Sequence, residues 1–352
     1  MDLSRLQQID RIIEDGIRQE KMPGCVVLIG RREGIVYRRA FGLKQKVPAN
    51  VPMTPDTLFD LASLTKPIAT GTSVMILRDR GLISLDARAA KYWPEFGVNG
   101  KERITIRQLL THTSGLIPDN SLKDYTGSRD DSFRKIAELK LSAPPGEKFM
   151  YSDVGFLVLG RIVERITGDT LSVFVTQNIC EPLNLQETGY QPSPELAARA
   201  AVTQQRDGQW MQGQVHDPRA WALEGIAGHA GLFSTADDLA AYATMMLNHG
   251  ALDGQRILSP DSIRVFTTGL EVPRGRRTPG WDSLSPYSSN RGDLMSEQAF
   301  GHGGFTGTGI WIDPADNLYV IFLSNRVHPD GKGSVNALIG RTGTIATAAI
   351  RP

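Results

Sequence analysis

Cysteine is scarce in this chain of 352 residues, in which Cys25 and Cys180 are the only two. Two cysteines do not make a disulfide framework, and they argue against a cysteine-based metal site. Cys25 lies in an apolar run, Cys-Val-Val-Leu-Ile, so we expect it to be a buried small hydrophobe. The sequence does not decide whether a disulfide joins them.

Excess charge and long apolar runs are also missing. The formal net charge is +1, and no basic run has interleaved aromatics, so we expect no nucleic-acid partner. No apolar run approaches the length of a membrane span, so none is expected. Apolar residues make up 40% and charged residues 22%, which is typical of a soluble globular protein large enough for one big domain or two intimate ones.

The N-terminus does not have the pattern of a signal peptide. Apolar residues recur at helical spacing with charged residues between them, which predicts an amphipathic surface helix over residues 3–17. The chain is therefore expected to be cytoplasmic, or extracytoplasmic with its leader absent, and the sequence does not choose between the two.

Both ends of the chain are rich in predicted strands. Residues 25–30 with 35–41, and 309–313 with 318–324, predict two β-hairpins, and a helix is expected over 335–350. Residues 269–299, rich in Gly, Pro, Arg and Ser, predict a long loop. We expect an α+β protein in which residues 1–60 and 275–352 build one antiparallel sheet flanked by the terminal helices. Residues 61–274 form a mostly helical region beside it, and one catalytic unit has its site in the cleft.

The stretch Ser63-Leu64-Thr65-Lys66-Pro67 places a serine and a lysine one helical turn apart. Proline is tolerated only in the first turn of a helix, so Pro67 predicts a helix that begins close to Ser63. Free backbone N–H groups at a helix start stabilise negative charge, which suits a nucleophile. Taken alone, Ser-x-x-Lys is better explained by a helix-start serine followed by a solvated lysine.

Other catalytic signatures are absent from the sequence. It has no Gly-x-Ser-x-Gly elbow, no Walker A loop and no His-Glu-x-x-His, and its six histidines lack ligand spacing. The glycine-rich run 301–309 lacks the spacing of a phosphate loop. We therefore expect no metal and no organic cofactor.

Three elements occur in a meaningful order: Ser63-Leu-Thr-Lys66, Tyr151-Ser152-Asp153 and His302-Gly303-Gly304. Their order, with the flanking stretches 109–116 and 228–235, resembles the class C β-lactamase and penicillin-binding-protein family of serine hydrolases, which includes β-lactamase-like carboxylesterases. The resemblance spans nearly the whole chain. It implies a β-lactamase/transpeptidase-like fold.

The resemblance also implies roles. Ser63 would attack an ester, amide or β-lactam carbonyl, Lys66 would accept its proton, directly or with Tyr151, and Tyr151 would pass the proton to the leaving group. Such a lysine is neutral part of the time, and burial near another cation lowers its pKa. The oxyanion hole would consist of the backbone N–H groups of Ser63 and Phe305.

Two substrate-binding positions depart from the penicillinase pattern. Asp153 replaces an asparagine, and a carboxylate only accepts hydrogen bonds, which weakens recognition of an amide. His302, followed by Gly303 and Gly304, replaces the lysine of Lys-Thr-Gly. Because histidine is charged only part of the time near neutral pH, selection of a substrate carboxylate should be weaker.

The first hypothesis is therefore a serine hydrolase of small carboxylic esters, with weak β-lactamase activity. The alternatives are a D-Ala-type carboxypeptidase acting on cell-wall peptides and a non-catalytic muropeptide-binding homologue. The intact Ser63, Lys66 and Tyr151 count against the latter.

Some polar and aromatic residues have no assigned role at this point. His112 is expected to be structural, at a helix end. His216, Asp217 and His229 lie in loop-like sequence and receive no role, and the candidates for substrate contact are Trp210, Trp221 and Trp281. The natural substrate and the oligomeric state stay open.

Overall fold

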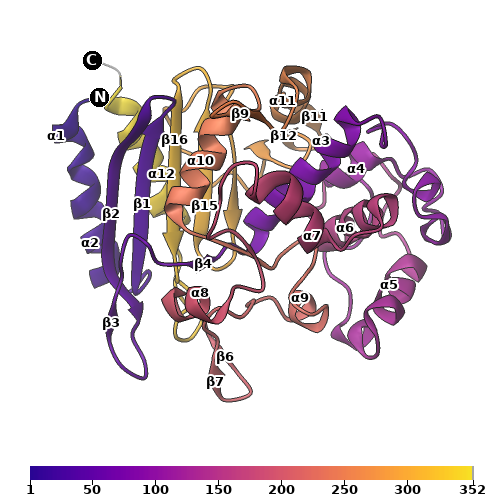
Figure 1. Ribbon diagram of the computed structural model, residues 1–352, viewed down its shortest axis with the longest axis horizontal. Coiled ribbons are helices and arrows are strands. Elements are labelled where there is room, and N and C mark those ends of the chain that lie inside the picture. Colours follow the sequence, from indigo (N-terminus) through magenta and orange to yellow (C-terminus); the bar gives the residue numbers. More distant parts are fainter. Residues whose placement is uncertain (351–352) are drawn as a thin grey trace.

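A computed structural model describes residues 1–350, and its centre is a nine-stranded antiparallel sheet with helices on both faces (Figure 1). The strand order is β11 (Leu270–Val272), β12 (Gly275–Arg277), β13 (Asp282–Leu284), β14 (Phe300–Gly304), β15 (Thr308–Asp313), β16 (Leu318–Ser324), β1 (Gly24–Arg31), β2 (Gly34–Gln45), β3 (Val51–Pro52). Strand β1 pairs with β16, so the two ends of the chain meet in mid-sheet. The predicted α+β fold class is confirmed, whereas the division at residues 60 and 275 stays a prediction.

Both predicted hairpins are present, as β1–β2 and β15–β16. Their side chains alternate between two cores because successive residues of a strand point to opposite faces. Val26 and Leu28 join the core shared with the helical region, while Val27 and Ile29 face the terminal helices. Strand β1 is thus buried on both faces, which explains its unbroken apolar run.

The long loop predicted over residues 269–299 is wrong for its first half. Residues 270–284 contain β11, β12 and β13, which extend the sheet beyond β14. Each strand has only three residues, and its stability comes from pairing with its neighbours rather than from its own composition. Only residues 285–299 form the connection to β14.

The terminal helices pack on one face of the sheet, where α2 and α12 lie side by side (Figure 1). The N-terminal helix is divided into two at Gln7, and both cysteines are buried and free, so no disulfide joins them. The helices of the described residues are α1 (Leu3–Leu6), α2 (Gln8–Arg18), α3 (Thr72–Asp79), α4 (Ile106–Leu110), α5 (Arg129–Glu138), α6 (Asp153–Thr167), α7 (Leu171–Val175), α8 (Pro194–Arg199), α9 (Pro218–Ala222), α10 (Ala236–Leu247), α11 (Pro260–Thr267), α12 (Asn336–Ala348).

Short strands complete the architecture. A three-stranded sheet joins β4 (Phe59–Asp60), β8 (Leu232–Ser234) and β5 (Gly189–Tyr190). Two further ribbons pair β6 (Gln205–Arg206) with β7 (Gln209–Trp210) and β9 (Ala251–Leu252) with β10 (Gln255–Arg256). Strand β4 leads directly into the Ser63 segment, so the small sheet anchors the start of that segment.

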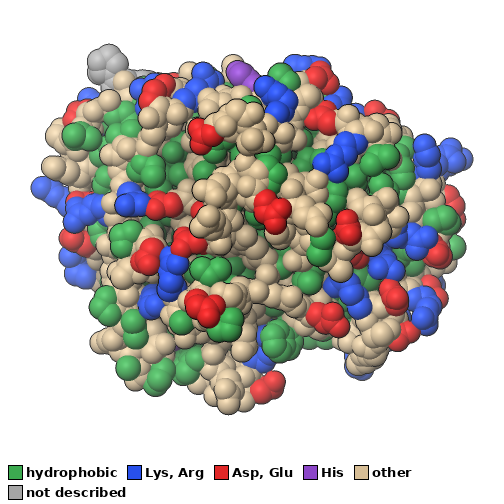
Figure 2. Space-filling view, viewed as in Figure 1, with side chains coloured by type: hydrophobic (Ala, Val, Ile, Leu, Met, Phe, Trp, Pro, Cys, Tyr) green, Lys and Arg blue, Asp and Glu red, His purple; other side chains and the backbone are tan. Residues whose placement is uncertain are grey.

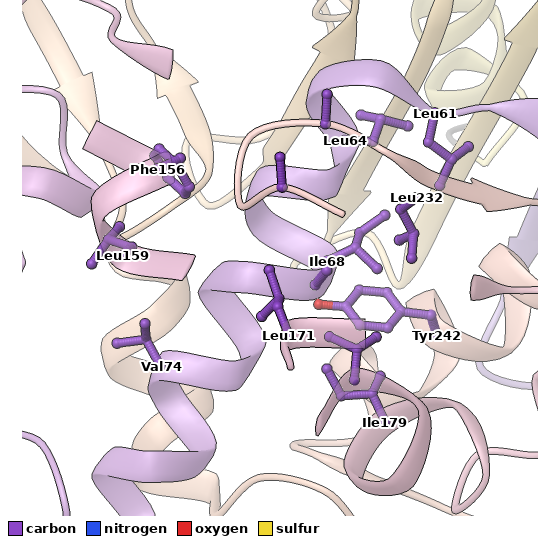
Figure 3. Close-up of a cluster of buried hydrophobic side chains, with 14 of the residues drawn as sticks. Leu61, Leu64, Ile68, Val74, Phe156, Leu159, Leu171, Ile179, Leu232 and Tyr242 are labelled. Atoms are coloured by element: carbon purple, nitrogen blue, oxygen red, sulfur yellow. The ribbon is translucent and has the colours of Figure 1, made fainter. Parts of the chain in front are cut away.

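The larger core lies beneath the Ser63 segment and extends along α3 and α6. Leu64, Ile68 and Val74 belong to this core, together with Phe156 of α6 and Tyr242 of α10, which lie on different sides of the helical segment (Figure 3). These side chains are almost fully buried, so the segment that carries Ser63 and Lys66 is held by packing on the side away from solvent.

Acidic and basic side chains are interspersed over the face shown in Figure 2, and no patch of one sign dominates it. Among residues 1–350, no helix is long and apolar enough to cross a membrane.

Candidate active site

Ser63 lies in a 3₁₀ helix, Ala62–Leu64, at the head of a continuous helical segment. A π-helical stretch, Lys66–Gly71, follows and leads into α3, with Pro67 in its first turn. The predicted helix start is confirmed, although the first turns are not α-helical. Ala62 has a φ of +46°, a left-handed conformation that is uncommon for alanine. The N–H of Ala62 donates to the buried Asp60 carboxylate at 2.8 Å, which helps to hold this bend.

The β14–β15 hairpin is bound directly to the Ser63 segment. The hydroxyls of Thr306 and Thr308 donate to the backbone oxygens of Asp60 and Leu61, at 2.7 and 3.0 Å. A Cβ on Gly304 would lie 2.5 Å from the oxygen of Leu61, so this close approach requires glycine. The end of β14 therefore lies beside Ser63.

Lys66 is fully buried and binds three oxygens. Its Nζ donates to Ser63 Oγ at 2.9 Å and to the backbone oxygen of His229 at 3.1 Å, and it lies 2.7 Å from Asp153 Oδ1. Burial lowers the pKa of Lys66, but the charge of Asp153 and the phenol of Tyr151 outweigh burial and raise the pKa above its ordinary value. A cation beside Lys66 was expected to favour its neutral form. The structure instead places the carboxylate of Asp153 there.

Tyr151 ends the segment before α6, and its neighbour Ser152 caps that helix by accepting from the N–H of Gly155 at 3.1 Å. The Tyr151 ring lies 5.0 Å from Lys66 Nζ. Burial raises the pKa of Tyr151 above its ordinary value, although Lys66 and a hydrogen bond with Ser63 lower it. The phenol is therefore protonated at neutral pH and can donate.

His302 lies on β14 with Gly303 and Gly304, and all three line a cavity that includes Ser63. Its Nδ1 lies 2.8 Å from the oxygen of Gly303. Burial, reinforced by the charges of Arg277 and Lys66, lowers the pKa of His302 well below its ordinary value. His302 is therefore neutral at neutral pH and does not supply the permanent positive charge that a lysine would have at this position.

Two cavities border Ser63, and four residues line both of them: Ser63, Tyr151, Tyr287 and Phe305. The first, of about 390 Å³, is here called the arginine cavity, because two guanidinium groups and one carboxylate line it: Arg277, Arg326 and Asp282. The second, of about 530 Å³, is called the aspartate cavity, because three carboxylates and one guanidinium line it: Asp119, Asp153, Asp217 and Arg219.

The residues left without a role border the aspartate cavity. His229 Nε2 lies 2.9 Å from Asp217 Oδ1, and His216 stacks on Phe305 with the ring centroids 5.6 Å apart. Asp217 caps α9 through the N–H groups of Arg219 and Ala220. The hydrogen bond and charge of His229 therefore help to hold the pKa of Asp217 well below its ordinary value, against the effect of burial.

Asp153, Asp217 and His229 offer ligand atoms within 4.8 Å of one another, a spacing that a divalent cation could use. Lys66 already pairs with Asp153, and His229 already contacts Asp217. Each of the two carboxylates therefore already has a side-chain partner among the described residues.

The tryptophan candidates lie away from the site, because none of the three lines either cavity. Trp281 is buried in the core against Phe300, Trp210 lies against His328, and Trp221 lies against Arg206. His112 is structural as expected: it follows α4 with a φ of +58°, and its Nδ1 accepts from the N–H of Ser152 at 3.0 Å. The sequence interpretation missed Arg277 and Tyr287, because it treated their segment as a loop.

Taken together, a serine beside a buried lysine and a half-buried tyrosine, at a position that lines two cavities, is the chemistry of a serine acyl hydrolase. The family model described as "Beta-lactamase" matches residues 9–342. The chain belongs to this beta-lactamase family of serine hydrolases.

Similar proteins carry several names. The chain is 32% identical to "N-acetylmuramyl-L-alanine amidase" of Bacillus subtilis, over 92% of this chain and 81% of that protein. It is 33% identical to "Putative D-alanyl-D-alanine carboxypeptidase" of Escherichia coli K12, over 93% and 83%.

Solved structures agree on the fold. A penicillin-binding protein homologue from Caulobacter crescentus has a TM-score of 0.79 at 22% identity, covering 98% of this chain and 97% of its own. A family VIII carboxylesterase has a TM-score of 0.76 at 22% identity, with the same coverage. At this identity the likeness shows the fold alone.

Proposed function

We propose that the protein cleaves an acyl bond through an acyl-enzyme on Ser63, with Lys66, Asp153 and Tyr151 moving the protons. The observation that carries this proposal is the 2.9 Å contact between Lys66 Nζ and Ser63 Oγ at the mouth of two cavities. A serine needs such a base within hydrogen-bond reach to become a nucleophile at neutral pH.

The ion pair of Lys66 with Asp153 decides how that base is made. Asp153 favours the charged form of Lys66, so Lys66 passes a proton across 2.7 Å to Asp153 only as it takes the proton of Ser63 and Oγ attacks the carbonyl carbon. The backbone N–H groups of Ser63 and Phe305 then stabilise the oxyanion that forms on the carbonyl oxygen.

Tyr151 completes the proton path. Its protonated phenol lies beside both Ser63 and Lys66, so it donates a proton to the leaving group and recovers one from Lys66. Water then enters in place of the leaving group, and the same transfers in reverse release the acid and restore Ser63.

The arginine cavity supports a substrate whose leaving group carries a carboxylate. Arg277 is fully buried and Arg326 is half-buried, so both guanidinium groups act where water screens charge poorly. Guanidinium is also the side chain best suited to a carboxylate. The relative named as a putative D-alanyl-D-alanine carboxypeptidase agrees with this chemistry, so we place carboxypeptidase-type cleavage of a peptide first. Hydrolysis of small esters comes second, favoured by the neutral His302.

A substrate panel tests the order. We expect turnover of a D-Ala-D-Ala peptide with a free carboxylate to exceed that of the same peptide ending in a carboxamide. p-Nitrophenyl acetate and a chromogenic cephalosporin complete the panel. Equal turnover of the two peptides would overturn the carboxylate argument, and ester turnover alone would restore small esters to first place.

Covalent labelling tests the mechanism. Intact-mass measurement after a fluorophosphonate probe should show one adduct, which Ser63→Ala abolishes. Ser334→Ala is the matched control, because Ser334 lines the same cavity and should leave the adduct in place. Absence of an adduct on the wild-type protein would refute the covalent mechanism.

A further inference from the structure

Tyr151 lies in a stack of three rings. The His112 ring is 4.4 Å from that of Tyr151 with an interplanar angle of 28°, and the Tyr287 ring is 4.8 Å away with an angle of 27°. One face of an aromatic ring has room for a single stacked neighbour at these distances, so His112 and Tyr287 cover opposite faces. The phenol of Tyr151 can therefore turn only by opening the stack.

The two outer rings differ in exposure. His112 is buried and belongs to the α4–α6 region, where it also lies 5.1 Å from Phe156. Tyr287 is 53% exposed and lines both cavities. Tyr287 is thus the ring that separates the Tyr151 face from solvent.

The backbone of Tyr287 is held in place. Its N–H donates to Ser285 Oγ at 3.2 Å, and Ser288 Oγ donates to Asp282 Oδ2 at 2.8 Å. Asp282 in turn pairs with the buried Arg277 at 3.3 Å. The turn that carries Tyr287 is therefore anchored to β12 and β13, and its ring keeps a defined place although half of it faces water.

We propose that Tyr287 is a positioning residue, which fixes the ring of Tyr151 so that its phenol points at Ser63 and Lys66. Nothing in the structure requires Tyr287 to exchange a proton, so its ring matters and its hydroxyl does not. The inference rests on the proposed function, in which Tyr151 carries the proton to the leaving group.

A double-mutant cycle on p-nitrophenyl acetate tests this role, because so small an ester leaves most of both cavities empty. We expect Tyr287→Ala to lower kcat/KM by about 10- to 100-fold, the cost of a misplaced catalytic group, with most of the loss in kcat. Tyr287→Phe keeps the ring and should stay within about twofold of the wild type. In a Tyr151→Phe background, Tyr287→Ala should change kcat/KM by less than about twofold.

Trp221→Ala is the matched control. Trp221 is 47% exposed, lies over Arg206 and lines neither cavity, so its loss should leave the rate unchanged. An equal loss from Tyr287→Ala in both backgrounds would overturn the proposal, because Tyr287 would then act without Tyr151. Full activity of Tyr287→Ala would overturn it too.

Nuclear magnetic resonance of ring-labelled tyrosine gives a readout without turnover. The chain has eight tyrosines, and Tyr151→Phe identifies the signal of Tyr151. That signal should shift in Tyr287→Ala, which removes the stacked ring, and stay in place in Tyr287→Phe. An unmoved signal in Tyr287→Ala overturns the stack, whereas full turnover by Tyr151→Phe overturns the proposed function instead.

Discussion

The two cavities beside Ser63 share four residues and differ in charge. The arginine cavity has two guanidinium groups against one carboxylate, and the aspartate cavity has three carboxylates against one guanidinium. A difference in charged lining between two cavities that share one nucleophile orients an asymmetric substrate, because its two ends match the cavities differently. Ser63 and Tyr151 line both cavities, so both ends of a substrate meet the same catalytic groups. Each cavity then selects the end of the substrate that it binds.

The ion pairs within the cavities sharpen this comparison. Each carboxylate of the aspartate cavity already has a cationic or hydrogen-bonding partner: Asp119 has Arg219 at 3.4 Å, Asp153 has Lys66 and Asp217 has His229. In the arginine cavity, Asp282 pairs with Arg277, and Arg326 donates to the backbone oxygen of Gly333 at 2.7 Å. Arg326 therefore has no carboxylate partner among residues 1–350, and the arginine cavity has charge to offer a ligand.

The largest expected effect comes from the residue that serves both cavities. Lys66→Met should lower kcat/KM by about 10³-fold or more for every substrate, because the variant lacks the base that activates Ser63. Steady-state kinetics on the peptide and the ester measure this, with circular dichroism as the control for folding. A loss confined to one substrate would show that Lys66 serves binding and not the common chemistry.

Asp153→Asn should have the next largest effect. In the wild type, Lys66 can pass its proton to Asp153, so the rate should stay flat from near neutral to alkaline pH. In the variant, the proton must leave to solvent. Asp153 raises the pKa of Lys66, so its removal lowers that pKa, and the neutral amine then forms within the accessible alkaline range.

The measurement for Asp153→Asn is kcat/KM against pH. We expect a loss of about 10- to 100-fold at pH 7 that recovers as the pH rises through the lowered pKa of Lys66. Identical profiles for the variant and the wild type would contradict a proton transfer to Asp153.

Arg326→Gln separates the cavities. Charge-assisted hydrogen bonds contribute about 1.5–3 kcal/mol, so we expect about tenfold or more loss on the carboxylate peptide and little change on its carboxamide. Arg326 is the better target because the loss of Arg277 would leave Asp282 buried without its partner. Comparable losses on both peptides would show that Arg326 supports the Phe305 ring, 4.5 Å away, rather than the substrate.

The smallest expected effect belongs to His302. Because burial lowers its pKa well below the ordinary value, His302 is neutral around neutral pH, and His302→Gln should leave the shape of the pH profile there unchanged. The profile of kcat/KM measures this. A limb near pH 6 that vanishes in the variant would show that His302 titrates after all.

Local sequence signals predicted much of the fold and nominated the catalytic residues. Pro67 predicted the helix start at Ser63, because proline lacks a backbone N–H and a helix tolerates it only in the first turn. Apolar runs on either side of a short turn predicted both hairpins, β1–β2 and β15–β16. The roles of Ser63, Lys66 and Tyr151 came from the order of three short motifs, and they stay predictions that the experiments above test.

Non-local contacts explain what was missed. Strands β11–β13 have three residues each and are stable only because β13 pairs with β14 and the other two strands pair in turn. No local sequence pattern predicts such pairing. Arg277 and Tyr287 therefore looked like loop residues, and the arginine cavity was not foreseen. The expectation of a cation beside Lys66 was wrong for the same reason: its partner Asp153 is distant in the chain.

By itself, the sequence determined that Ser63 and Lys66 share one helix face at a helix start, since that follows from backbone geometry within a single turn. Only the tertiary structure decided that Asp153 favours the charged form of Lys66, that Tyr287 covers Tyr151, and that the two cavities beside Ser63 differ in their charged linings. Burial and electrostatics depend on which distant groups come within a few ångströms in a low-dielectric interior, and chain order alone does not contain that information.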